Sequence, residues 1–316
     1  MFSRSKILIY VVLGILLSAL TIMLLESDKC NCTTNPLTKR GRPHSGTFGV
    51  KTRTRRMFDP ALPVIYTITP TYARIEQKAE LTRLSQTFLH LSNFHWILVE
   101  DSVNKTRLVT NLLRSSGLSY THLNALTPPQ MKLKATDARF AKPRGVWQRN
   151  AGLSWIRDNL NPETQSGVVY FADDDNTYDL RIFAEMRMAQ KVAVWPVGFT
   201  GHLKYGGPVV TNGKVTGWLT GLTFPRPFAI DMAGFAINLR LFFQYPEAKF
   251  TYKVSPGLQE STILERLNII LSDFEPVADN GTKVLVWHTR TMPPILDAEA
   301  TNIEELLQGP YFTVEV

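Results

Sequence analysis

The stretch that decides the fold is Val168-Val169-Tyr170-Phe171-Ala172-Asp173-Asp174-Asp175-Asn176, in which five apolar residues run directly into three carboxylates and an amide. A short apolar run rich in β-branched and aromatic residues predicts a buried strand. In open α/β sheets, ligands bind beyond the carboxyl ends of the strands. The polar end of this strand therefore predicts a ligand site.

Two earlier strands show the same character. Residues 64–68 form an apolar run that ends in Thr69-Pro70-Thr71, and residues 96–99 form one that ends in Glu100-Asp101. Apolar spacing and composition predict a further strand at 120–123 and helices over 76–91, 106–115 and 148–160. Strands that alternate with helices predict an α/β fold with a mostly parallel sheet and helices on both faces. From about residue 192, short apolar runs between glycines predict a more antiparallel second half.

The N-terminal segment has the composition of a membrane anchor. Residues 7–25 contain no charged side chain, which as a helix is long enough to span the ~30 Å hydrocarbon core of a bilayer. Arg4 and Lys6 precede the segment, and Glu26 and Asp28 follow it, so we expect residues 1–6 to be cytosolic. A cleaved signal peptide is the alternative, although its apolar core is typically only about 7–15 residues long.

Both alternatives deliver the rest of the chain to a lumenal compartment. Residues 26–60 have no helical or strand period and are expected to form a stem before a folded body over 61–316. Cys30 and Cys32 are the two cysteines of the chain, so disulfides inside the body are excluded, while a cross-link between chains, a free thiol or lipidation stays open. Three sequons are candidates for N-glycosylation: Asn31, Asn104 and Asn280.

The basic charge of the chain belongs to its N-terminal extension. Residues 1–59 hold ten Lys and Arg against three Asp and Glu, which leaves 25 basic and 24 acidic residues in the remainder. Nucleic-acid binding needs a basic surface on the folded part, so the sequence predicts no nucleic-acid partner.

The aspartate triplet predicts a metal site. Adjacent carboxylates repel one another unless a cation holds them, and a hard divalent ion bound to oxygen ligands and a diphosphate supplies that cation. The alternative is that residues 173–176 cap a helix beginning near Tyr178. A two-metal phosphohydrolase would need further ligands, and the six His show no H-x-x-x-H spacing. A serine hydrolase is disfavoured because the chain has no Gly-x-Ser-x-Gly elbow.

Several segments, in order along the chain, resemble the β-1,3-glucuronosyltransferases, which complete the proteoglycan linker or build the HNK-1 type epitope. These segments are residues 69–74, 144–150, 170–178, 194–198, 226–228, 231–235 and 286–291. The resemblance implies a GT-A fold with a Rossmann-like donor half over 61–190 and a more antiparallel acceptor half over 191–316. It also implies a UDP-glucuronate donor, Mn²⁺, inversion at the anomeric carbon, a homodimer, and a single-pass Golgi protein whose catalytic body is lumenal.

The resemblance also implies a role for individual residues. Those that match the binding site for UDP-glucuronate are Pro70, Thr71, Tyr72, Asp101, Arg144, Arg149, Asp173, Asp174, Asp175, His288 and Arg290, with Asp175 as the metal ligand. Arg226 and Asp231 match residues that hold the acceptor galactose. Glu260 matches the general base that takes a proton from the galactose 3-hydroxyl, whereas its local sequence indicates only a carboxylate near a helix N-terminus.

Three positions depart from the family pattern. Gly206 stands where a Glu is usual, Leu222 where an acceptor-stacking Trp is usual, and Trp147 where an acidic residue is usual. Losing a carboxylate and an aromatic platform weakens recognition of the usual disaccharide. We therefore expect retained donor chemistry and a different or broader galactoside acceptor. The competing hypothesis is a non-catalytic UDP- and glycan-binding protein with a degraded acceptor pocket.

Overall fold

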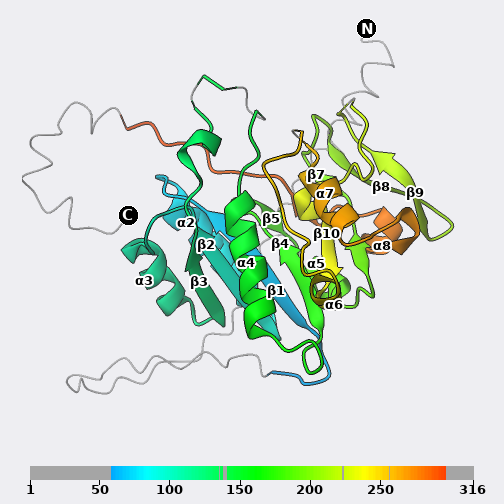
Figure 1. Cartoon of the computed structure of the whole chain (residues 1–316), viewed down its shortest axis with the longest axis horizontal. Coiled ribbons are helices and arrows are strands. Elements are labelled where there is room, and N and C mark those ends of the chain that lie inside the picture. Colours follow the sequence, from blue (N-terminus) through cyan, green and yellow to red (C-terminus); the bar gives the residue numbers. More distant parts are fainter. Residues whose placement is uncertain (1–57, 135, 138–140, 223, 256, 297–316) are drawn as a thin grey trace, which may run out of the picture. The chain divides into compact units, whose positions relative to one another are not determined.

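The computed structural model describes residues 58–296 apart from 135, 138–140, 223 and 256 (Figure 1). The expected anchor over 7–25, Cys30, Cys32 and the sequon at Asn31 lie outside the described residues. No helix within the described part of the chain is long and apolar enough to cross a bilayer.

A seven-stranded sheet forms the centre of the body, in the order β11-β6-β10-β4-β1-β2-β3. Its strands are β1 (Val64–Thr71), β2 (Phe94–Glu100), β3 (Tyr120–Asn124), β4 (Gly167–Phe171), β6 (Val192–Val194), β10 (Phe235–Asn238) and β11 (Phe274–Pro276). The four strands β4-β1-β2-β3 are parallel, as predicted. β10 runs antiparallel to both β4 and β6, so strands that follow residue 190 complete the same sheet.

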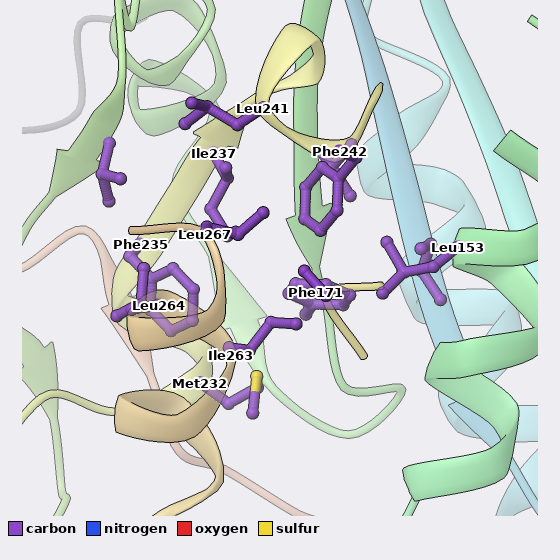
Figure 2. Packing of buried hydrophobic residues seen from close by; sticks show 14 of the residues in the cluster. Leu153, Phe171, Met232, Phe235, Ile237, Leu241, Phe242, Ile263, Leu264 and Leu267 are labelled. Carbon is purple, nitrogen blue, oxygen red and sulfur yellow. The ribbon is translucent and has the colours of Figure 1, made fainter. Parts of the chain in front are cut away.

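Helices cover both faces of this sheet because each central strand buries alternate side chains in opposite directions. On β4, Val168 and Tyr170 pack with α2 (Gln77–Phe88), α3 (Arg107–Ser116) and α5 (Leu180–Met186). Val169 and Phe171 pack on the other face with α4 (Val146–Asn159), α6 (Leu239–Gln244) and α7 (Gln259–Arg266). Figure 2 shows Phe171 of β4 in this second core, between side chains of α4, α6 and α7. Complete burial of such a side chain stabilises the fold by about 1.5–3 kcal/mol.

A second sheet of five short strands follows the order β5-β12-β7-β8-β9. Its strands are β5 (Thr177–Tyr178), β7 (Val197–Gly198), β8 (Tyr205–Thr211), β9 (Lys214–Leu219) and β12 (Val286–Trp287). All its pairs are antiparallel except β12 with β7, which agrees with the expected antiparallel character of the second half. The β8–β9 hairpin turns at Asn212-Gly213, where both residues have positive φ, as tight hairpin turns require.

Short helices complete the body: η1 (Pro129–Met131), η2 (Met232–Gly234), η3 (Leu271–Asp273) and α8 (Ala278–Gly281). The next helix along the chain after the aspartate triplet is α5, and Asp179 caps it by accepting a hydrogen bond from the Arg181 amide at 2.9 Å. The interpretation of residues 173–176 as a helix cap is therefore wrong. These residues form the loop between β4 and β5, so their side chains do not cap a helix.

Candidate functional site

Side chains from three strand ends meet at the carboxyl edge of the parallel sheet. Thr71, the last residue of β1, donates a 2.6 Å hydrogen bond to Asp174 in the loop after β4. The Asp101 amide, directly after β2, donates to the Thr71 carbonyl at 2.7 Å. The Asp101 carboxylate accepts from the Thr127 amide at 2.7 Å. The structure thus brings together polar residues that the sequence placed at separate strand ends.

The three aspartates have different surroundings. Arg149 pairs with Asp173 at 2.8 Å, and Arg74 pairs with Asp174 through two contacts of 2.9 Å. No hydrogen bond or ion pair to the Asp175 carboxylate is found among residues 58–296 as far as they are described. Burial, followed by the charges of Asp173 and Asp174, raises the pKa of Asp175 to about 6. Asp175 is therefore the carboxylate of this loop that forms no ion pair within the described part, although the charge of Arg74 partly opposes the rise of its pKa.

The residues around Asp175 fit a divalent cation. Glu80 on α2, Asp174 and Asp175 each place one carboxylate oxygen within 4.8 Å of the others. Oxygen-only ligands of this kind suit Mg²⁺ or Mn²⁺. Arg74 already engages Glu80 and Asp174, which leaves Asp175 to the metal. Sequence reasoning missed Glu80, although a carboxylate next to Leu81 on the buried side of an amphipathic helix is a detectable signal.

His288 lies directly after β12 and connects the aspartate loop to Asp231, the residue before η2. Its Nε2 donates to Asp231 at 2.7 Å, and its Nδ1 lies 3.0 Å from the Asn176 amide oxygen. The Asp231 carboxylate only accepts, so Nε2 carries a hydrogen, and the role of Nδ1 towards Asn176 depends on the protonation state of the ring. Burial lowers the pKa of His288, but the hydrogen bond and charge of Asp231, with the charges of Asp173 and Asp175, raise this pKa to about 9.

Asp231 is held as a carboxylate. Burial is the largest single cause and raises its pKa, but the hydrogen bond and charge of His288 together with the hydrogen bonds from Ala233 and Thr200 lower it overall. Thr200 donates to the same Asp231 oxygen as His288, at 2.9 Å, and the Ala233 amide donates to the other oxygen at 2.9 Å. Thr200 is a further residue that sequence reasoning missed, because nothing in its local pattern marks it.

Glu260 lies in the first turn of α7 and is partly buried. Burial is the largest cause that raises its pKa to about 7, and Asp231 adds to the effect, while Arg149 and Arg226 oppose it. A carboxylate that is half-ionised near neutral pH is suited to accept a proton in catalysis. The local interpretation as a carboxylate stabilised by the helix dipole does not account for a raised pKa, since a helix N-terminus favours the charged form.

Glu260 and the aspartate loop belong to one polar region. Arg149 forms an ion pair with Asp173, and its charge also lowers the pKa of Glu260. The charge of Asp231 raises the pKa of Glu260, and Asp231 binds His288, which in turn contacts Asn176 in the aspartate loop. The aspartate loop and the candidate base thus interact with the same charged groups, Arg149 on one side and the Asp231–His288 pair on the other.

Arg226 lies close enough to Glu260 for the charges of the two side chains to interact. It donates to Thr220 at 2.7 Å, its Nε is buried with no hydrogen-bond partner among the described residues, and burial lowers its pKa. Its guanidinium lies 5.5 Å from the ring centre of Phe224, which is 40% exposed. A buried unpaired donor beside an exposed aromatic ring is an arrangement that binds a sugar hydroxyl and a sugar face.

Four other residues were predicted to bind UDP-glucuronate: Pro70, Tyr72, Arg144 and Arg290. Tyr72, Arg144 and Arg290 are exposed, with the Tyr72 ring 4.7 Å from the Arg74 guanidinium. Pro70 packs close to the start of α4, where a Cβ on Gly145 would come within 3.2 Å of it. The sequon residues Asn104 and Asn280 are exposed on the surface.

The departures from the family pattern lie on the acceptor side or the rim. Gly206 is buried in β8, and a Cβ there would lie 3.0 Å from the Leu219 carbonyl and 3.1 Å from the Thr200 methyl group. Leu222 is half-buried, and Trp147 is largely exposed in the first turn of α4. A side chain at position 206 would therefore require the Leu219 carbonyl or the Thr200 methyl group to move by a few tenths of an ångström.

Comparison with known proteins identifies a matching family, related sequences and a solved structure. The model of glycosyltransferase family 43 matches residues 84–292. The chain is 54% identical over 239 residues to galactosylgalactosylxylosylprotein 3-beta-glucuronosyltransferase 1 of Rattus norvegicus, covering 74% of this chain and 71% of that protein. It is 49% identical over 258 residues to galactosylgalactosylxylosylprotein 3-beta-glucuronosyltransferase 2 of Homo sapiens, covering 81% and 78%. The solved structure of S. aureus TarS 1–349 matches 72% of this chain and 60% of that chain, at 13% identity and a TM-score of 0.43.

Proposed function

The chain belongs to glycosyltransferase family 43, and from this membership we propose that it transfers glucuronate from UDP-glucuronate to the 3-hydroxyl of a terminal galactose. The observation that carries the proposal is the pair of carboxylates with raised pKa values, Asp175 and Glu260, in one polar region. Asp175 forms no ion pair within the described residues, and Glu260 is suited to accept a proton.

The residues at the carboxyl edge of the sheet bind UDP-glucuronate and offset the negative charge of the departing UDP. Thr71, Tyr72 and Asp101 hold the uridine at the ends of β1 and β2, with Pro70 packed beside them. Arg144, Arg149, His288 and Arg290 pair with the diphosphate and the glucuronate carboxylate, since planar guanidinium groups bind such anions through two hydrogen bonds. Mn²⁺ held by Asp175, when bound, supplies positive charge next to the departing UDP.

The acceptor side supplies the base. Arg226 and Asp231 hold the galactose, and Glu260 removes the proton from its 3-hydroxyl as that oxygen forms a bond to the anomeric carbon. The bond from this carbon to UDP breaks at the same time, and its electron pair leaves with the diphosphate. A single displacement converts the α-linked donor into a β-linked product.

The wider setting follows from the same resemblance. The donor and acceptor halves form a GT-A fold, residues 7–25 anchor the chain in the Golgi membrane with the body in the lumen, and two chains form a homodimer. The alternative function is a non-catalytic UDP- and glycan-binding protein, which the missing side chain at Gly206 favours. The raised pKa of Glu260 favours catalysis, because binding alone does not need a base poised near neutral pH.

We expect the purified full-length chain, given UDP-glucuronate and Mn²⁺, to glucuronidate galactosides other than the linker Gal-β1,3-Gal. The missing side chain at Gly206 and the aliphatic Leu222 remove two contacts that select the usual disaccharide. The measurement is product formation on a panel of galactose-terminated glycans, with UDP release as a second readout. Strict preference for Gal-β1,3-Gal would contradict the altered acceptor, and UDP binding without transfer to any member would favour the non-catalytic alternative.

We expect the ionisation of Glu260 and of His288 to set the pH dependence of glucuronate transfer. Glu260 accepts a proton only when ionised, so activity should rise as pH increases through about 7. His288 binds the diphosphate as an imidazolium, so activity should fall as pH increases through about 9. The measurement is kcat/KM against pH, which should be bell-shaped between these two values. A profile that does not rise through about 7 would remove Glu260 from the role of base.

A further inference from the structure

Glu80 is a buried carboxylate that the proposed reaction does not use. It lies on α2 and is only 2% exposed. A carboxylate at this depth is stable only when its charge is paired and its oxygens accept hydrogen bonds. Glu80 satisfies both needs with one partner shortly before α2 and another 211 residues away, and Arg83 on α2 adds an ion pair at 3.6 Å. Arg74 forms an ion pair with Oε2, and the Thr291 amide donates to Oε1 at 2.9 Å.

Arg74 connects Glu80 to the aspartate loop. The guanidinium contacts both oxygens of Asp174 at 2.9 Å while it also pairs with Glu80. Thr71 donates to the same Asp174 carboxylate at 2.6 Å. One cation is therefore shared by two carboxylates, and this arrangement fixes Asp174 in place beside Asp175. The charges of Asp174 and Glu80 still raise the pKa of Asp175, while that of Arg74 lowers it.

Thr291 connects Glu80 to the segment that carries His288 and Arg290. The Thr289 hydroxyl donates to the Asp175 carbonyl at 2.9 Å, and the Thr291 amide donates to Glu80. The segment 288–291 is thus attached at one point to the aspartate loop and at another to α2. Arg83 on α2 adds weaker contacts, at 3.3 Å to the Thr291 hydroxyl and 3.4 Å to the Asp175 carbonyl.

We propose that Glu80 is a positioning residue that couples metal binding to diphosphate binding. Through Arg74 it fixes Asp174 beside the metal ligand Asp175, and through the Thr291 amide it holds His288 and Arg290 against the same loop. This inference deepens the proposed function and rests on it. Glu80 touches neither the sugar nor the acceptor, so its effect should fall on the donor alone.

The test separates the two links of Glu80. Glu80→Gln keeps an oxygen for the Thr291 amide and the volume of the side chain, but it removes the charge that pairs with Arg74. Glu80→Ala removes both links. The matched control is Glu76→Gln, because Glu76 lies at the start of the same helix and makes no capping hydrogen bond. UDP binding to the full-length chain is measured by calorimetry with and without Mn²⁺, together with KM values for UDP-glucuronate and a galactoside.

Loss of a residue that orients a metal site typically costs about 10–100-fold in affinity. We expect Glu80→Gln to weaken Mn²⁺-dependent UDP binding by about 10-fold and Glu80→Ala by about 100-fold. The KM for UDP-glucuronate should rise, the KM for the galactoside should stay unchanged, and Glu76→Gln should resemble the wild type. If Glu80→Ala does not fold, the isosteric Gln variant decides the question.

Two results would overturn the inference. One is UDP affinity in Glu80→Gln equal to that of the wild type in the presence of Mn²⁺. The other is an equal loss for UDP and galactoside with a lowered melting temperature, which marks a purely structural role. Failure of the proposed function has a different signature, since the wild-type chain itself would then transfer no glucuronate to any galactoside, or would show no Mn²⁺-dependent UDP binding.

Discussion

Glu260→Gln should lower the rate of glucuronate transfer by about 10²–10⁴-fold, the usual contribution of a general base. The amide cannot accept the proton of the galactose 3-hydroxyl, and it has nearly the same volume as the carboxylate. UDP binding should be unchanged, because Glu260 lies on α7, on the acceptor side of Asp231 and His288. The measurement is kcat for transfer together with the affinity for UDP in the presence of Mn²⁺.

Glu265→Gln is the matched control for this variant. Glu265 lies on the same helix and is exposed, whereas Glu260 is partly buried. The control should transfer glucuronate at the wild-type rate. Near-full activity of Glu260→Gln in a protein that still binds UDP would show that another group is the base.

Asp175→Asn should reduce transfer by at least about 100-fold and abolish its stimulation by Mn²⁺. A metal next to a developing charge contributes several kcal/mol to the transition state, and each 1.36 kcal/mol corresponds to a tenfold change in rate. Asp175 is the carboxylate of the loop that forms no ion pair in the described part of the chain, whereas Glu80 and Asp174 are both paired with Arg74. The measurement is the initial rate of transfer as a function of Mn²⁺ concentration.

Asp158→Asn is the control for loss of an acidic residue, since Asp158 is exposed on α4. We expect this variant to retain both the rate and the metal dependence of the wild type. An Asp175→Asn variant that is still activated by Mn²⁺ with the wild-type affinity would place the metal elsewhere.

Much of the fold could be predicted from local patterns. The apolar runs that end in Thr69-Pro70-Thr71, Glu100-Asp101 and the aspartate triplet are β1, β2 and β4, because a strand buried on both faces leaves a continuous apolar run. Observed helix ends differ from the predicted ends by a few residues, as for α2, which spans Gln77–Phe88 where 76–91 was expected. The cap of α5 was misplaced because Asp179 offers the same capping chemistry as the residues before it.

Less of the candidate site than of the fold could be predicted from local sequence patterns. Glu80 and Thr291 are 211 positions apart, and Thr200 and Asp231 are 31 apart, so no spacing rule brings them together. The resemblance to the glucuronosyltransferases identified Glu260, whose local sequence is that of an ordinary helix start. Its raised pKa depends on burial and on Asp231, which are properties of the folded chain.

The central claim is that Asp175 and Glu260 flank one space for the reacting sugar. The most direct test is a crystal structure of the chain with Mn²⁺, UDP and a galactoside, with the metal located by its anomalous signal. The account predicts manganese on Asp175 and the diphosphate, with the galactose 3-hydroxyl at hydrogen-bond distance, about 2.6–3.2 Å, from Glu260. Manganese bound away from Asp175, or a galactoside that lies out of reach of Glu260, would contradict it.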